Sequence, residues 1–206
     1  MVDLISLSLR TRPCTVSTKS IRPGANRPFF FTFDRLADAS GDNIEQFINL
    51  AGALVDGLET KLLRGKPARL DAKEQHQLLT TRATHTINEW DFPNSESVRK
   101  LVFFIAQKCI NKTLEPNAPL NDGANAFGIP QKEMNSLQEN APALVSVLHF
   151  ALAYNAITLQ ENYECKNRTW CLFELGGLPN LVYRLTLNRG GFCEGHLSDL
   201  LESIRE

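Results

Sequence analysis

Apolar residues recur every three or four positions along the first half of the chain. This spacing places them on one face of a helix, the usual pattern of a helix that packs against a core. It predicts helices at residues 34–39, 43–62, 71–90 and 95–109. Two end signals support these boundaries: Asp71 and Glu74 are spaced as a capping box, and Gly65 stands where many helices end in a left-handed residue.

The period changes within the stretch 141–175. Apolar residues keep a helical spacing up to Leu152, and then alternate with polar residues at Ile157 and again near Trp170. The polar, charged interval 161–168 separates the two alternating runs, which predicts a β-hairpin with an exposed tip. A helix that leads into such a hairpin is typical of a winged helix-turn-helix.

The remaining segments complete a mainly helical protein. Residues 115–130 are almost all turn formers and predict a long loop, after which Pro130 begins a short helix that ends at Leu137. Helical spacing returns at 178–187 and at 196–204.

The expected fold class is therefore mainly α: a helical bundle followed by a winged-helix-like subdomain with one β-hairpin. We expect an N-terminal strand and arm over residues 1–33, a helical subdomain over 34–92, and the winged-helix-like subdomain over 95–206.

Composition narrows the class of protein. With 43% hydrophobic and 22% charged residues, the chain of 206 residues has the composition of an ordinary globular protein. Its net charge of −1 gives no global basic field that would attract nucleic acid. The sequence lacks an apolar run of about 20 residues, the length that spans a membrane. Five cysteines without paired spacing favour reduced thiols, so we expect a cytoplasmic protein.

The candidate nucleic-acid contacts lie at the predicted hairpin tip and on the short helix before it. They are Lys166, Asn167, Arg168 and Lys132. Two features oppose this interpretation. Glu161 and Glu164 cancel much of the positive field at the tip, and the predicted helix 141–153 contains no lysine or arginine.

The candidate protein contacts are apolar residues in segments that lack a helical period. Leu120 and Phe127 lie in the predicted long loop, and Phe30 lies in the phenylalanine-rich segment 29–33. Each of them is a side chain that could dock a partner from the surface.

The residues do not form a recognisable catalytic or metal site. Cys193 and His196, together with Cys165 and Cys171, lack the spacing of known zinc sites. Neither a set of nucleophile and base nor a phosphate-binding Gly-rich loop ending in Gly-Lys-Ser/Thr is present. We therefore expect no cofactor and no metal, and a chain that is not an enzyme.

One short motif resembles a known family. Phe33-Asp34-Arg35-Leu36, followed by Ser40-Gly41-Asp42-Asn43-Ile44-Glu45-Gln46-Phe47, resembles the start of the helical lid of AAA-type ATPases of the origin-recognition and STAND kind. In those proteins a winged helix commonly follows the lid, so the resemblance implies a lid plus winged helix without its ATPase domain. Glu45 departs from the family pattern, which has an arginine that contacts the nucleotide phosphates.

Three hypotheses follow. The first is a non-catalytic binding module, the lid and winged helix of a nucleotide-switched ATPase, which contacts DNA or a protein partner that includes an ATPase core. The second is a stand-alone winged-helix regulator of transcription. The third is a protein-interaction domain without a nucleic-acid role, which the near-zero net charge favours.

Overall fold

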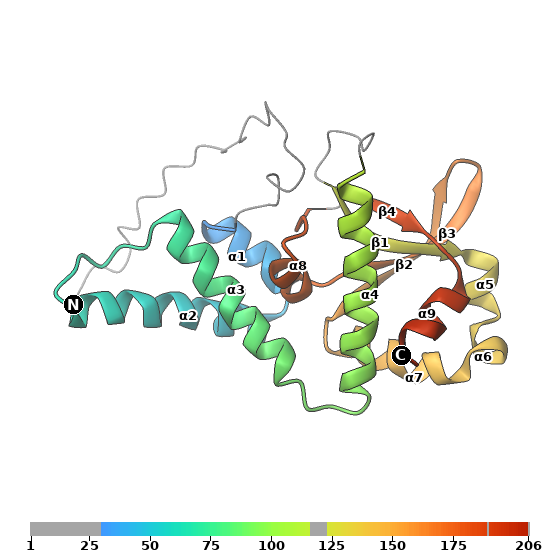
Figure 1. Ribbon diagram of the computed structural model, residues 1–206, viewed down its shortest axis with the longest axis horizontal. Helices are drawn as coiled ribbons and strands as arrows, with labels where there is room; N and C mark the ends of the chain where they lie inside the picture. The colour runs from blue at the N-terminus through green and yellow to red at the C-terminus, as the bar shows by residue number, and fades with distance from the viewer. Residues whose placement is uncertain (1–29, 116–122, 189, 206) are drawn as a thin grey trace.

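The computed structural model of the protein describes residues 30–115, 123–188 and 190–205 (Figure 1). The described chain is mainly helical and contains one small mixed sheet. The helices are α1 (Phe33–Ser40), α2 (Ile44–Leu63), α3 (Ala72–Asn88), α4 (Ser95–Thr113), α5 (Gln131–Asn135), α6 (Leu137–Asn140), α7 (Pro142–Ala153), α8 (Gly177–Tyr183) and α9 (Leu197–Ser203). The strands are β1 (Ala124–Pro130), β2 (Ile157–Cys165), β3 (Arg168–Leu175) and β4 (Gly191–Glu194).

The sequence signals locate the first helices well. Asn43 caps α2, because its side-chain oxygen accepts a hydrogen bond from the backbone N–H of Gln46 at 3.0 Å. Gly65 follows α2 with a φ of 68°, the left-handed conformation expected there. Asp71 and Glu74 form the predicted capping box of α3.

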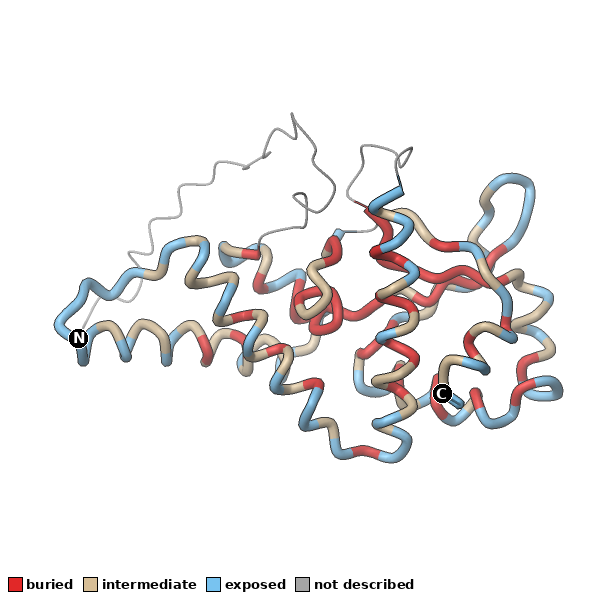
Figure 2. Tube along the Cα trace, viewed as in Figure 1, coloured by how far each residue is buried: buried red, intermediate tan, exposed pale blue. Residues whose placement is uncertain are grey.

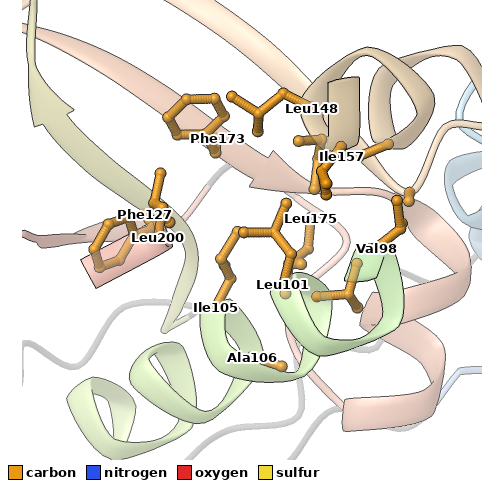
Figure 3. Close-up of a cluster of buried hydrophobic side chains, with 14 of the residues drawn as sticks. Val98, Leu101, Ile105, Ala106, Phe127, Leu148, Ile157, Phe173, Leu175 and Leu200 are labelled. Atoms are coloured by element: carbon orange, nitrogen blue, oxygen red, sulfur yellow. The ribbon is translucent and has the colours of Figure 1, made fainter. Parts of the chain in front are cut away.

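The sheet has the strand order β2-β3-β1-β4. β2 and β3 form the predicted hairpin, β3 pairs antiparallel with β1, and β4 adds to the other edge of β1 in parallel. The long helix α4 packs on the sheet, where Leu101 and Ile105 lie near Phe173 and Leu175 (Figure 3). These side chains are at most 4% exposed, so the sheet and α4 share one apolar core.

A second core holds the three N-terminal helices together. Its buried residues include Phe30, Leu36, Leu50 and Leu79, and α8 adds Leu178 and Leu181 from the other end of the chain. α2 and α3 extend away from the sheet, whereas α8 lies between α3 and α4 (Figures 1 and 2). By its packing, α8 joins the two cores, although it lies within the sequence range predicted for the second subdomain.

Two glycines allow this close junction. A Cβ at Gly177 would lie 1.9 Å from the carbonyl oxygen of Ala39 in α1. A Cβ at Gly176 would lie 2.0 Å from the carbonyl oxygen of Asn155. Both are backbone oxygens and cannot move aside as the end of a flexible side chain can, so only glycine fits at these positions.

The structure corrects two predictions. The prediction of a loop over 115–130 was wrong for its second half, because residues 124–130 form the buried strand β1. Strand β4 was missed as well. Small residues concealed β1: Gly128 has no side chain because a Cβ there would lie 2.5 Å from the ring of Phe192. Of the predicted arm 1–33, residues 1–29 lie outside the described part of the chain.

Candidate functional site

The hairpin formed by β2 and β3, here called the wing, turns through two residues. Lys166 and Asn167 both adopt left-handed φ angles, 51° and 59°, as a tight type I′ connection requires. Both side chains are exposed, and Arg168 follows them at the start of β3, also exposed. The three wing candidates are therefore together and accessible.

The wing packs against β4 rather than standing free. The ring of Phe192 lies 5.3 Å from Trp170 and 5.9 Å from Tyr163, measured between ring centroids. The Nζ atom of Lys166 lies 2.9 Å from Oε1 of Glu194. The hydrogen bond to this carboxylate raises the pKa of Lys166, so the lysine stays charged but its charge is balanced.

The other two candidate cations are unpaired within the described chain, but carboxylates occur on the same hairpin as Arg168. Arg168 and Lys132 are exposed and form no ion pair with any residue that the structure describes. Glu161 and Glu164, on the same hairpin, are also exposed. The wing thus lacks the net positive field that attracts a phosphate backbone.

Helix α7 directly precedes the wing in the chain, and its solvent face is uncharged. The exposed residues are Pro142, Ala143, Ser146, His149 and Ala153. No lysine or arginine occurs on this helix, so it offers no permanently cationic side chain to phosphates and no bidentate contact to guanine.

The surface beside α7 is mostly apolar and shallowly indented. A depression of about 540 Å³ lies between α5, α6, α7 and the sheet. Its apolar lining includes Met134, Val145, Leu152 and Leu159. A second depression of about 420 Å³ adjoins it, because Val145 and His149 line both. Apolar side chains of a binding partner would fit this surface better than a phosphate backbone would.

The aromatic residues predicted to contact a partner are in the interior. Phe127 is 1% exposed and packs with Phe104 and Gly195 in the sheet core. Phe30 is also 1% exposed and packs against His76. The prediction of a surface contact through these two residues was therefore wrong, since a strand and a helical core already bury them. Leu120 lies outside the described residues.

Glu133 and His196 form a contact between α5 and the start of α9. Glu133 Oε1 lies 2.8 Å from Nδ1 of His196, while its other oxygen accepts the backbone N–H of Leu197 at 2.8 Å. This arrangement fastens the start of α9 to α5.

No group of three or more potential metal ligands occurs among the residues that the structure describes.

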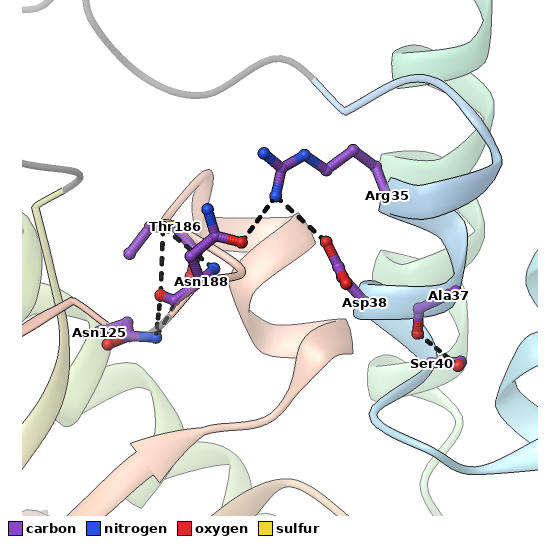
Figure 4. A network of polar contacts seen from close by, with 7 residues as sticks. All are labelled: Arg35, Ala37, Asp38, Ser40, Asn125, Thr186 and Asn188. Carbon is purple, nitrogen blue, oxygen red and sulfur yellow. Dashed lines mark hydrogen bonds and ion pairs between the residues drawn. The ribbon is translucent and has the colours of Figure 1, made fainter. Parts of the chain in front are cut away.

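A polar network connects the loop after α8 to β1 and α1 (Figure 4). The Asn125 side chain donates to the carbonyl oxygen of Asn188 at 3.1 Å, and its own oxygen accepts from Gly190 N at 3.1 Å. Arg35 donates to the side-chain oxygen of Asn188 at 2.9 Å. Because Asn125 is 3% exposed and hydrogen-bonded on both sides, it positions backbone and is not free to bind a ligand.

Comparison with known proteins identified no match to this chain. No protein-family model, curated protein or solved structure matches the chain. Within the described segments, none of the helices has both the length and the apolar character needed to cross a membrane.

Proposed function

We propose that this chain is a non-catalytic binding module in which residues 34–92 form a lid-like helical subdomain and residues 95–206 form a winged helix that docks a protein. The order of elements supports the winged helix. α4, β1, α5 with α6, α7, and then the β2–β3 hairpin follow one another as helix, strand, two helical segments and wing. The sheet order β2-β3-β1 places the strand before the helices beside the second wing strand.

The uncharged outer face of α7 is the observation that favours a protein partner over DNA. DNA-reading helices insert side chains into the major groove and are held by lysine and arginine contacts to phosphates. α7 has neither cation, and the adjoining surface at Val145 and Leu152 is an apolar depression. Burial of this depression by apolar side chains of a partner would be favourable by about 25 cal/mol per Å² of apolar surface.

The lid-like assignment rests on the resemblance of residues 33–47 to the AAA family. Glu45 lies exposed in the first turn of α2, where a carboxylate interacts favourably with the helix dipole. This explains Glu45 without a nucleotide contact. Because the sequence has no phosphate-binding loop, any nucleotide in such an assembly would be held by an ATPase core outside these residues.

A second candidate function is DNA binding by a stand-alone winged-helix regulator. The observation in its favour is that Arg168 and Lys132 are exposed and without an ion pair among the described residues. A salt titration of binding to duplex DNA separates this function from protein docking.

Photo-cross-linking in cells tests the docking proposal. A photoreactive residue at His149, on the exposed face of α7, should give a protein adduct, whereas one at the exposed Lys108 of α4 should not. Val145→Asp should remove the adduct, and the matched variant Ala143→Asp, at an exposed position of the same helix, should retain it. Adducts with nucleic acid at His149, or protein adducts unaffected by Val145→Asp, would contradict the proposal.

A further inference from the structure

Helix α2 has a second apolar face that nothing in the described structure covers. Ile44, Ile48, Val55 and Leu62 are 71%, 63%, 50% and 58% exposed, respectively. The opposite side of the helix is occupied, since Leu50 is fully buried in the N-terminal core. In Figure 2 the extended α2 accordingly shows mostly exposed and intermediate residues. Contiguous apolar surface of this kind marks an interaction site.

The spacing of the apolar residues on this face indicates that its binding partner is a helix. The apolar positions along this face are the exposed Ile44, Ile48, Val55 and Leu62, together with the half-buried Ala51 and Leu58, of which Ala51 also packs against the N-terminal core. They alternate in steps of four and three, which is the heptad pattern by which one helix packs along another. With a rise of about 1.5 Å per residue, the seam is roughly 27 Å long. Its occupant is therefore a helix of comparable length.

One edge of the seam is acidic. Glu45 and Glu59 lie beside it, both exposed and both without a hydrogen-bond or ion-pair partner among the described residues. Asp56 lies farther round the helix and pairs with Arg82 of α3 at 3.2 Å. Two uncompensated carboxylates therefore face the position of an incoming helix, where charges set the choice of partner.

A second copy of the chain would not satisfy these carboxylates. In an antiparallel pair of α2 helices, Glu45 would lie opposite Glu59 of the other copy. In a parallel pair, Glu59 would lie opposite Leu54 of the other copy, and Glu45 would have no residue of α2 opposite it, because that heptad position precedes the start of the helix at Ile44. Neither arrangement supplies a positive charge, and the antiparallel one brings like charges together.

We infer that the outer face of α2 docks an amphipathic helix of a partner protein whose apolar heptad seam is flanked by lysine or arginine. This surface is separate from the depression at α7, and the inference does not depend on the winged-helix proposal. Burial of the apolar seam drives the association, and the basic residues of the partner neutralise Glu45 and Glu59.

Two designed peptides test the inference with the full chain. Both contain three heptads with isoleucine and leucine at the seam positions, and they differ only in having lysine or glutamate at every flanking position. Fluorescence anisotropy should show binding of the lysine peptide, with about tenfold weaker binding of the glutamate peptide, as expected for two surface ion pairs. Ile48→Asp should abolish binding of the lysine peptide without changing the thermal midpoint, because Ile48 is 63% exposed.

Charge reversal separates specific docking from general attraction. Glu45→Lys/Glu59→Lys should invert the preference between the two peptides. Glu139→Lys/Glu164→Lys changes the net charge equally at exposed positions away from α2 and should leave the preference unchanged. The inference is overturned if neither peptide binds, or if both double variants shift the preference alike. It is also overturned if light scattering shows a dimer that Ile48→Asp dissociates, since a second copy would then cover the face.

Discussion

The Nζ atom of Lys166 lies 2.9 Å from Oε1 of Glu194, which joins the tip of the wing to the last strand of the sheet. β2 and β4 are the two edge strands of the sheet, and β3 and β1 lie between them. The wing tip must therefore curl over the end of β1 to reach β4. This contact uses a cation that a DNA-binding wing would present to phosphate.

Glu194→Gln should release Lys166. We expect the pKa of Lys166 to fall toward its ordinary value, because the hydrogen bond to the carboxylate and its charge are what raise it. NMR titration of the lysine side chain measures this, and Glu164→Gln is the control. An unchanged pKa in Glu194→Gln would show that the pair does not form in solution.

The contact between Glu133 and His196 predicts a pH window for the attachment of α9. The hydrogen bond and charge of Glu133 raise the pKa of His196, so the stability gained is present below about pH 6.5 and lost as the pH rises through the folded pKa. Burial raises the pKa of Glu133, but the hydrogen bonds from Leu197 and His196 outweigh it and leave the pKa lowered. That stability is present above about pH 4.5 and lost as the pH falls through the folded pKa.

Protection of the α9 amides from hydrogen exchange should therefore be greatest, relative to Glu133→Gln, between these two limits. NMR titration of the His196 ring provides the direct check. A ring that titrates identically in the wild type and in Glu133→Gln would rule out the contact.

Gly177→Ala should strongly destabilise the protein. The new methyl group would lie 1.9 Å from the carbonyl oxygen of Ala39, so α8 and α1 would have to separate, at a cost of roughly 3 kcal/mol. Gly52→Ala is the matched control, because nothing lies within 4 Å of its Cβ position in α2. That variant should stabilise the protein by about 0.5–1 kcal/mol. Urea denaturation measures both, and equal effects would contradict the close junction.

Thiol labelling should distinguish the cysteines by burial. Burial raises the pKa of Cys171 to about 12, and a hydrogen bond with Cys193 together with burial raises the pKa of Cys109. Both thiols are fully buried, whereas Cys165 is partly exposed on the wing. Maleimide labelling followed by peptide mass spectrometry should therefore modify Cys165 well before Cys109 and Cys171, which react only after opening of the core. Simultaneous labelling of all three would contradict the packing of the sheet.

The sequence predicted the long helices and the hairpin because their periods are regular and their ends are marked. Gly65 and the pair Asp71 and Glu74 act on residues close to them in the chain, so they can be identified from the sequence alone. β1 could not be recognised in this way. Its strand character comes from pairing with β3 and β4 rather than from its own small residues, such as Ala126 and Gly128.

The positions of the candidate contact residues could be predicted only in part. The sequence located the exposed wing residues Lys166, Asn167 and Arg168, and the absence of cations on α7 was visible in it. The partner of Lys166 was not, since Glu194 lies on a four-residue strand far along the chain. Phe127 was misassigned to the surface because the strand that buries it was read as a loop.

The central claim, that the winged helix docks a protein rather than DNA, is tested most directly by fluorescence anisotropy with a labelled random-sequence duplex. The purified chain is titrated at low and then moderate salt, alongside the variant Lys166→Glu/Arg168→Glu. We predict no binding that depends on salt and no difference between the wild type and the variant. Binding at low salt that weakens steeply as salt rises, and that the double variant abolishes, would establish phosphate contacts by the wing and contradict the claim.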